Sequence, residues 1–148
     1  MKKAVLIAIA ALAVLLGLTA CRQKPPEPAV PLPVALSSFT HVKLDYDMDL
    51  GDYRYAFDLT QAQQDEFIRL LQADKWFDRG ELPGRGYLPV VDAYGDQAWS
   101  LVVGYWDEEY TIIGLIDLSD EDRTRKIFYF APFEVQENAK AFREKLKI

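Results

Sequence analysis

The sequence predicts one α+β domain with a mainly antiparallel sheet of about six strands and two helices, in the order ββαββββα. Two amphipathic segments of helical period indicate the helices, one near the middle of the chain and one at its end. Short apolar runs indicate the strands. Two of these runs precede the first helical segment and four lie between the two helices, which gives the predicted order.

The first two strands are predicted to form a hairpin. Residues 43–50 alternate strictly between apolar and charged side chains, which is the period of a strand with one buried face. Residues 51–52 fit a two-residue turn, and residues 53–59 form the expected return strand. Asp49 would then lie opposite Arg54 as a favourable charge pair. The expected apolar pairs are Leu50–Tyr53, Met48–Tyr55, Tyr46–Phe57 and Leu44–Leu59.

The first helix is predicted to begin at Thr60. Thr60 and Gln63 have the spacing of a capping box, in which each side chain accepts a hydrogen bond from the backbone of the other residue. The helix is expected to end near Asp74, and Trp76 and Phe77 are expected to close the edge of the core. The apolar stripe of the helix consists of Ala62, Phe67, Leu70 and Leu71.

Four more strands are predicted at residues 87–94, 98–106, 110–116 and 126–131. Pro89 favours an edge position or a bulge, because proline cannot donate a hydrogen bond to a neighbouring strand. The second and third of these strands are apolar on both faces and need cover on both sides, which the two helices are expected to supply. The last helix is predicted from residue 132 or 133 to 147. Its apolar positions are Val135, Ala139, Phe142 and Leu146.

The start of the chain differs in composition from the predicted domain. We expect a signal peptide at residues 1–20, a Pro-rich tether at residues 21–36, and a single α+β globular domain at residues 37–148. Five prolines between residues 22 and 33 favour an extended, semi-rigid chain that would hold the domain away from a membrane. The predicted domain carries 13 basic and 22 acidic residues. This negative charge argues against binding to nucleic acid or directly to anionic lipid.

The end of the predicted signal peptide carries a specific motif. Lys2 and Lys3 precede an apolar run over residues 4–18, and small residues then lead to the only cysteine, Cys21. The stretch Leu18-Thr19-Ala20-Cys21 resembles the lipobox of bacterial lipoproteins. The resemblance implies cleavage between Ala20 and Cys21, a diacylglycerol on the thiol of Cys21, and a membrane-anchored location on the extracytoplasmic side of the cell envelope.

This resemblance covers only the signal region, and it assigns no family to the exported domain. Arg22 stands where lipoproteins kept at the inner membrane of diderm bacteria carry aspartate. The resemblance therefore implies the outer membrane or periplasm in a diderm cell, and the outer face of the cell membrane in a monoderm one. Two alternatives stay open. Residues 4–20 could be a short transmembrane anchor, or the protein could be secreted in soluble form after cleavage at Ala20.

The sequence shows no evident catalytic set. His41 is the only histidine, and no free thiol remains once Cys21 is lipidated, so a nucleophile–base pair would have to depend on His41. Three aspartates in the first strand lack the Gly and Glu positions of a calcium-binding loop, which favours the solvated face of a strand. We expect no cofactor and no metal. The weak candidates for binding a cation are Asp117, Asp120, Glu121 and Asp122.

Aromatic residues are numerous in the predicted domain, and some could exceed what two helices can cover. The candidates for an exposed patch that binds protein or glycan are Tyr105, Trp106 and Tyr110, together with Tyr53, Tyr55 and Tyr94. The alternative is that these side chains belong to the core. The expected function is a non-enzymatic binding or interaction domain at the cell envelope. The alternatives are a structural or assembly lipoprotein of an envelope complex, and a small hydrolase. The expected partners are the membrane, through the lipid on Cys21, and an envelope protein or glycan, but not nucleic acid.

Overall fold

The computed structural model describes residues 26–78 and 87–148, and it confirms the predicted α+β fold with the order ββαββββα. The predicted cleavage site, Cys21 and Arg22 lie outside the described residues. The strands are β1 (His41–Asp47), β2 (Asp52–Asp58), β3 (Leu88–Tyr94), β4 (Trp99–Tyr105), β5 (Tyr110–Asp117) and β6 (Lys126–Pro132). The helices are α2 (Gln61–Leu70) and α3 (Phe133–Leu146), and two 3₁₀ turns are η1 (Leu36–Ser38) and η2 (Ala73–Lys75).

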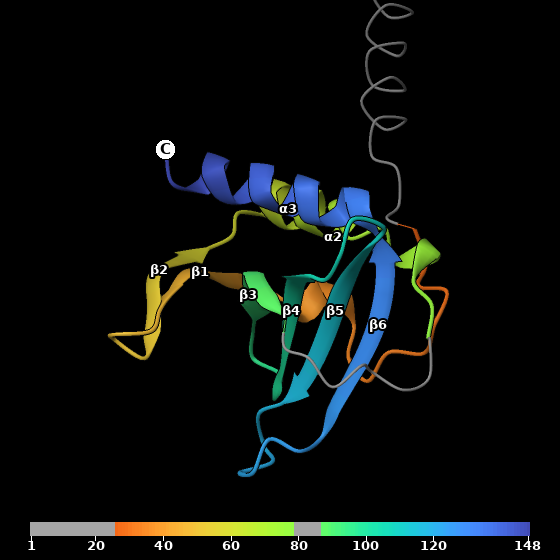
Figure 1. Cartoon of the computed structure of the whole chain (residues 1–148), viewed down its shortest axis with the longest axis horizontal. Coiled ribbons are helices and arrows are strands. Elements are labelled where there is room, and N and C mark those ends of the chain that lie inside the picture. Colours follow the sequence, from red (N-terminus) through yellow and green to blue (C-terminus); the bar gives the residue numbers. More distant parts are fainter. Residues whose placement is uncertain (1–25, 79–86) are drawn as a thin grey trace, which may run out of the picture.

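The six strands form one sheet in the order β2-β1-β3-β4-β5-β6, and all neighbours are antiparallel. Both helices pack on the same face of this sheet and lie side by side (Figure 1). Phe67 of α2 and Phe142 of α3 bring their ring centroids to 5.6 Å. Both rings are buried in the main core, which also takes Leu101, Val103 and Ile113 from the sheet. Within the residues that the structure describes, the other face of the sheet, which we call the open face, therefore has no helical cover.

Aromatic side chains cover part of the open face instead. Trp106 and Phe130 are buried there with ring centroids 5.5 Å apart, and Ile112 of β5 is buried in the same cluster. The half-buried residues that pack against them are Phe77, Tyr87, Tyr110 and Phe128. The prediction that β4 and β5 need cover on both faces is thus correct, but the prediction that helices supply both covers is wrong. The cluster uses loop and strand residues over β4, β5 and β6.

The β1–β2 hairpin exists, but its predicted register is wrong. Leu44 lies opposite Tyr55 rather than Leu59, and the strands end at the pair Asp47–Asp52. The carboxylate of Asp47 accepts hydrogen bonds from the backbone of Asp49 at 2.9 Å and of Leu50 at 3.3 Å, so the turn begins at residue 48, three residues earlier than the alternation suggests. Consequently Arg54 pairs with Asp47, at 2.6 Å, and not with Asp49.

The backbone conformation of Asp45 explains why the alternation in β1 no longer separates buried from exposed side chains beyond that residue. Asp45 has φ = 56°, a left-handed conformation that aspartate tolerates better than most residues. Its carboxylate lies 3.8 Å from the guanidinium of Arg143 on α3 and 3.0 Å from Nζ of Lys147, which directly follows α3. Residues beyond Asp45 are no longer on the buried face. Tyr46 is 51% exposed, and Met48 is 89% exposed.

The second half of the expected tether is part of the folded surface. Ala29 donates a backbone hydrogen bond to Ala73 at 3.0 Å, and the hydroxyl of Tyr129 donates to the carbonyl of Pro31 at 2.8 Å. The side chains packed against the main core here are Val30, Leu32 and Val34. Residues 29–36 are therefore packed on the domain and are not a free spacer, which shortens the reach expected from the sequence. No helix among the described residues has the length and apolar character to cross a bilayer.

The predicted capping box is present at the start of α2. The Thr60 hydroxyl accepts from the backbone N–H of Gln63 at 3.2 Å, and the Gln63 amide oxygen accepts from the backbone N–H of Thr60 at 2.9 Å. We expect Thr60→Ala to lower the free energy of unfolding by about 1 kcal/mol, because one helical N–H loses its acceptor. Urea denaturation followed by circular dichroism measures this loss. Ala62→Ser, on the exposed side of the same helix, is the control and should change stability by less than about 0.5 kcal/mol.

Candidate functional site

Two hollows on the surface of the described residues are candidate sites, and one of them gathers several charged side chains. The larger, of about 660 Å³, lies beside the N-terminal segment and is lined mainly by prolines and aliphatic residues over Ile68 of α2. The smaller, of about 520 Å³, lies on the open face next to the aromatic cluster. We call this smaller hollow the open-face pocket. It is the better candidate site, because functional pockets combine apolar walls with a few converging polar groups.

Tyrosine rings form much of the wall of the open-face pocket. Tyr46 and Tyr53 come from the β1–β2 hairpin and meet edge to face, with ring centroids 5.2 Å apart. Tyr87 lies across β4 because Gly104 has no side chain there. A Cβ atom at that position would lie 2.5 Å from Cδ2 of Tyr87. Tyr94, at the end of β3, completes the set of four tyrosines. Val102 and Ile116 contribute aliphatic surface, so the pocket is amphipathic.

Charged side chains enter the same pocket from four different segments. Lys43 comes from β1, Asp52 from the start of β2, Asp92 from the middle of β3, and Arg123 from the β5–β6 connection. Nζ of Lys43 lies 5.2 Å from the centre of the Tyr94 ring, which is a cation–π distance. The pocket therefore holds two cationic and two anionic groups within an aromatic wall.

Asp92 is the least ordinary of these groups. Burial raises the pKa of its carboxyl, and this effect outweighs the opposing influence of the Tyr53 hydroxyl and of the charges on Lys43 and Arg123. Its Oδ1 atom is buried and has no hydrogen-bond partner among the described residues. Burial, together with the charge of Asp92, also raises the pKa of the Tyr53 and Tyr87 hydroxyls. Both hydroxyls are protonated at neutral pH, as tyrosine ordinarily is, and can donate hydrogen bonds. An unpaired buried acceptor costs about 1–3 kcal/mol, which makes a donor from outside the chain favourable here.

The raised pKa of Asp92 predicts a specific pH dependence. The folded state holds its proton more tightly than the unfolded state, so this group destabilises the fold as the pH rises from its unfolded pKa through its folded pKa. Asp92→Asn removes that loss. We expect the free energy of unfolding of the variant, relative to wild type, to be higher at pH 7 than at pH 3. Urea titrations at both pH values measure the difference, and a constant difference would contradict it.

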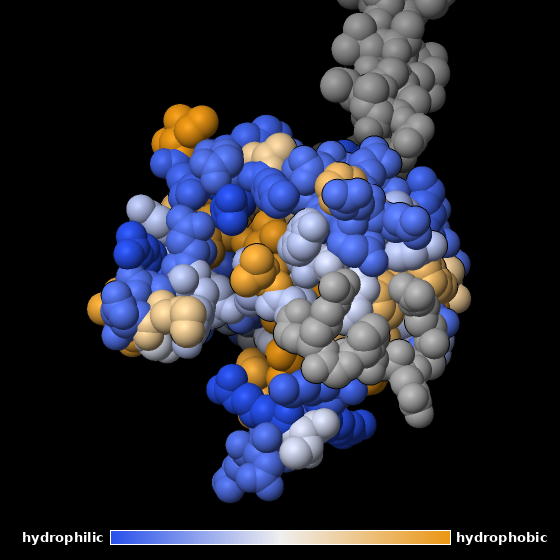
Figure 2. All heavy atoms as spheres, in the orientation of Figure 1, coloured by the Kyte–Doolittle hydropathy of each residue, from blue (hydrophilic) through white to orange (hydrophobic). Residues whose placement is uncertain are grey.

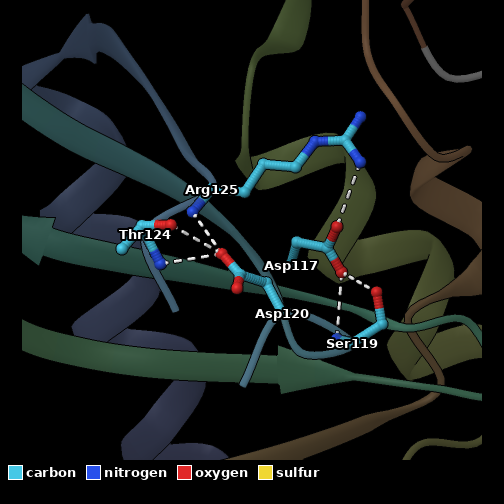
Figure 3. A network of polar contacts seen from close by, with 5 residues as sticks. All are labelled: Asp117, Ser119, Asp120, Thr124 and Arg125. Atoms are coloured by element: carbon cyan, nitrogen blue, oxygen red, sulfur yellow. Dashed lines mark hydrogen bonds and ion pairs between the residues drawn. The ribbon is translucent and has the colours of Figure 1, made fainter. Parts of the chain in front are cut away.

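The predicted acidic cluster closes a loop (Figure 3). The carboxylate of Asp117 accepts from the Ser119 hydroxyl at 2.6 Å and from Arg125 at 3.2 Å. The carboxylate of Asp120 accepts from the Thr124 hydroxyl at 2.8 Å and from the backbone of Arg125 at 2.9 Å. These hydrogen bonds lower the pKa of both carboxyls.

The other two members of that cluster, Glu121 and Asp122, are exposed. Within residues 26–78 and 87–148, no three His, Cys, Asp or Glu side chains are placed to share a metal ion. The structure therefore assigns Asp117 and Asp120 to loop closure between β5 and β6, where each carboxylate already accepts hydrogen bonds from within the loop.

The aromatic residues singled out in the sequence do not form one patch. Trp106 is only 5% exposed and Tyr110 is half-buried, and both belong to the aromatic cluster. Tyr105 is 37% exposed and lies near Lys140 of α3, 5.9 Å from Nζ to the ring centre. The core alternative thus holds for Trp106 and Tyr110. Two other candidates, Tyr53 and Tyr94, are in the open-face pocket.

His41 is not placed as the base of a nucleophile. Its Nδ1 atom lies 2.6 Å from a carboxylate oxygen of Asp58, and its ring stacks on Tyr94 at 5.0 Å. In the part of the chain that the structure describes, no serine is hydrogen-bonded to His41. No family model matches the chain, and no curated protein or solved structure is significantly similar to it.

A second exposed feature lies at the tip of the β1–β2 hairpin, which projects from the body of the domain (Figure 1). Figure 2 shows hydrophobic and strongly hydrophilic surface next to each other at this projecting end. The exposed apolar residues are Tyr46, Met48 and Leu50, at 51%, 89% and 70%. We call them the hairpin tip.

Sequence reasoning missed Asp92 and Arg123 as members of a site. One feature of the sequence could have indicated Asp92, because it is the only charged residue in an otherwise apolar strand. A buried carboxylate is costly unless it is paired or takes part in function. Arg123 carried none. It stands in a polar connection among other charges, and only the course of the loop brings it to the pocket.

Proposed function

We propose that the protein is a lipid-anchored, extracytoplasmic binding domain and that the open-face pocket is its binding site. The observation that carries the binding part is the convergence, in one hollow of about 520 Å³, of four tyrosines and half-buried Asp92, whose buried Oδ1 atom has no hydrogen-bond partner among the described residues. A buried acceptor without a partner lowers the stability of a fold, so its presence in a pocket favours a role in binding a ligand. The site offers recognition surface but no paired nucleophile and base, so the proposed role is binding and not catalysis.

Anchoring rests on the resemblance of Leu18-Thr19-Ala20-Cys21 to a lipobox. If Cys21 carries the lipid, the chain between Cys21 and Ala29 can extend roughly 28 Å at most. The domain would then stay close to the membrane surface, and the open-face pocket would be presented to ligands of the adjacent envelope layer. Two or three acyl chains give a stable anchor without help from the acidic domain surface.

Mass spectrometry of the membrane-extracted protein tests the anchor. The expected result is a chain that begins at Cys21 and carries a diacylglycerol on its thiol. Cys21→Ser should yield an uncleaved precursor of unmodified mass. A wild-type protein with an unmodified Cys21, or with residues 1–20 still attached, would contradict the anchoring proposal.

The hairpin tip favours a second candidate function, a structural or assembly lipoprotein. Exposed Met48 and Leu50 on a projecting hairpin could insert into a pocket of a partner protein, and methionine adapts readily to such surfaces. The tip leads directly into β2 (Asp52–Asp58), which is an edge strand of the sheet, so a partner could also extend the sheet there.

One crosslinking experiment separates the two candidates. A photoreactive amino acid replaces Leu118, an exposed residue at the pocket, or Met48 at the hairpin tip, in the full-length protein expressed in its native cells. The binding proposal predicts a discrete adduct from position 118. An adduct from position 48 alone would favour the assembly role. Position 148, fully exposed at the C-terminus, is the control and should give only diffuse products.

A further inference from the structure

The charges of the open-face pocket narrow the class of ligand, given the binding role proposed above. Two cations, Lys43 and Arg123, share the pocket with two carboxylates, Asp52 and Asp92. Residues 37–148 as a whole have nine more acidic than basic residues, so the pocket is balanced while the rest of the domain is not. A ligand with a large net charge of either sign would gain little net attraction from this arrangement.

An ammonium ligand is further disfavoured because an ammonium group of the protein itself, on Lys43, already occupies a cation–π position in the pocket. Tyrosine-lined pockets attract cations over the ring face, but Nζ of Lys43 occupies this position on Tyr94 at 5.2 Å. The same lysine, with Arg123, partly offsets the negative charge of Asp92. The remaining tyrosine surface is therefore available to an uncharged partner.

The uncharged partner must satisfy both kinds of surface in the pocket. The rings of Tyr46, Tyr53 and Tyr87 and the side chains of Val102 and Ile116 present apolar surface. Among these, the tyrosine hydroxyls offer hydrogen bonds, and buried Oδ1 of Asp92 lacks a donor. A pyranose ring matches this combination, since one face of the ring carries C–H groups and its edge carries hydroxyl donors and acceptors.

We propose that the open-face pocket binds a neutral saccharide unit of a glycan, with its ring packed on Tyr53 and Tyr87 and a hydroxyl or amide group hydrogen-bonded to Asp92. Lys43 and Arg123 donate to further oxygens of the sugar. The proposal rests on the binding function argued above and adds the ligand class. A peptide is the competing class, and it is an outcome of the test.

Saturation-transfer difference NMR on the full-length protein in detergent tests the proposal. The neutral probes are tri-N-acetylglucosamine, maltotriose and cellotriose, and the comparison probes are trilysine and trialanine. At least one neutral oligosaccharide should bind saturably, with signals strongest at the ring protons. Asp92→Asn should weaken that binding about tenfold, because a neutral amide oxygen replaces a charged acceptor. Tyr53→Phe should weaken it less, because only the hydroxyl is lost.

Two variants serve as controls. Tyr55→Ala changes a second tyrosine of β2, the strand of Tyr53, and the ring of Tyr55 lies against Lys147. Tyr105→Ala changes an exposed tyrosine at the end of β4. Neither residue lines the pocket, so binding should change less than twofold. Thermal unfolding confirms that every variant folds, and Asp92→Asn is expected to be at least as stable as wild type at pH 7.

The possible failures are distinguishable. Binding of trialanine or trilysine that Asp92→Asn weakens, without binding of any sugar, would overturn the saccharide class and leave the binding function standing. Sugar binding that Asp92→Asn and Tyr53→Phe do not affect would place the ligand elsewhere and overturn the inference. If none of the probes binds while position 118 still crosslinks in cells, the ligand class is wrong. If position 118 also fails to crosslink, the proposed function fails with it.

Discussion

Replacing Phe67 by alanine is expected to lower the free energy of unfolding by about 3–5 kcal/mol. Phe67 is fully buried in α2, and its ring packs on Phe142 of α3 at 5.6 Å between the two helices and the sheet. The substitution removes that apolar surface and leaves a cavity that rigid neighbours cannot fill. Domains of this size are stable by about 5–15 kcal/mol, so the variant should lose much of its margin. Urea denaturation monitored by circular dichroism gives the value.

A double-mutant cycle shows whether the two helices are coupled through these rings. Phe142→Ala should cost a similar amount, and the double variant should lose less than the sum by about 0.5–1.5 kcal/mol, which is the usual coupling of an aromatic pair. Tyr105→Ala, at an exposed ring, should change stability by less than about 1 kcal/mol. A loss below about 1 kcal/mol for Phe67→Ala would mean that α2 does not pack on α3 as described.

The parts of the fold that the sequence predicts correctly are those set by local chemistry. The capping box at Thr60 and the helical spacing of Val135, Ala139 and Phe142 identify α2 and α3 because each depends on residues within a few positions. Pro89 indicates a bulge for the same reason, and the register of β3 on β4 does shift between Pro89 and Val91.

The hairpin register and the placement of the helices depend on contacts that are distant in sequence. Strict alternation over residues 43–50 predicts one buried face, but the left-handed conformation of Asp45, next to Lys147 at the end of α3, turns the later residues away from the core. Likewise, apolar side chains on both faces of β5 indicate that both faces are covered by other parts of the protein. They do not indicate that one of these covers is a set of aromatic rings instead of a helix.

The candidate site was the least accessible to sequence reasoning. Its charged members come from β1, β2, β3 and the β5–β6 connection, and no two are close enough in the chain to form a motif. The acidic residues that do form a motif, at 117 and 120, use their oxygens within their own loop. A cluster visible in sequence was therefore structural, while the pocket formed from scattered residues.

Replacing Gly95 by alanine is expected to lower the free energy of unfolding by about 2–3 kcal/mol, through a clash with backbone. A Cβ atom at Gly95 would overlap the carbonyl oxygen of Ser38 and lie 3.0 Å from the carbonyl carbon. That backbone cannot retreat easily. It ends η1, which buries Leu36, and it precedes Phe39, which is only 1% exposed. Thr40 then donates a backbone hydrogen bond to Tyr94 at 3.0 Å, which holds the two segments together.

Gly51→Ala is the informative comparison, because that glycine is required for a different reason. Gly51 has φ = 65° in the hairpin turn, and nothing lies within 4 Å of the position its Cβ atom would take. Only backbone strain opposes the substitution, so the expected loss is about 1 kcal/mol. Thermal and urea unfolding of both variants should therefore rank Gly95→Ala as clearly the more damaging. Equal losses would indicate that η1 yields freely, and the packing of the N-terminal segment against β3 would then be weaker than its burial implies.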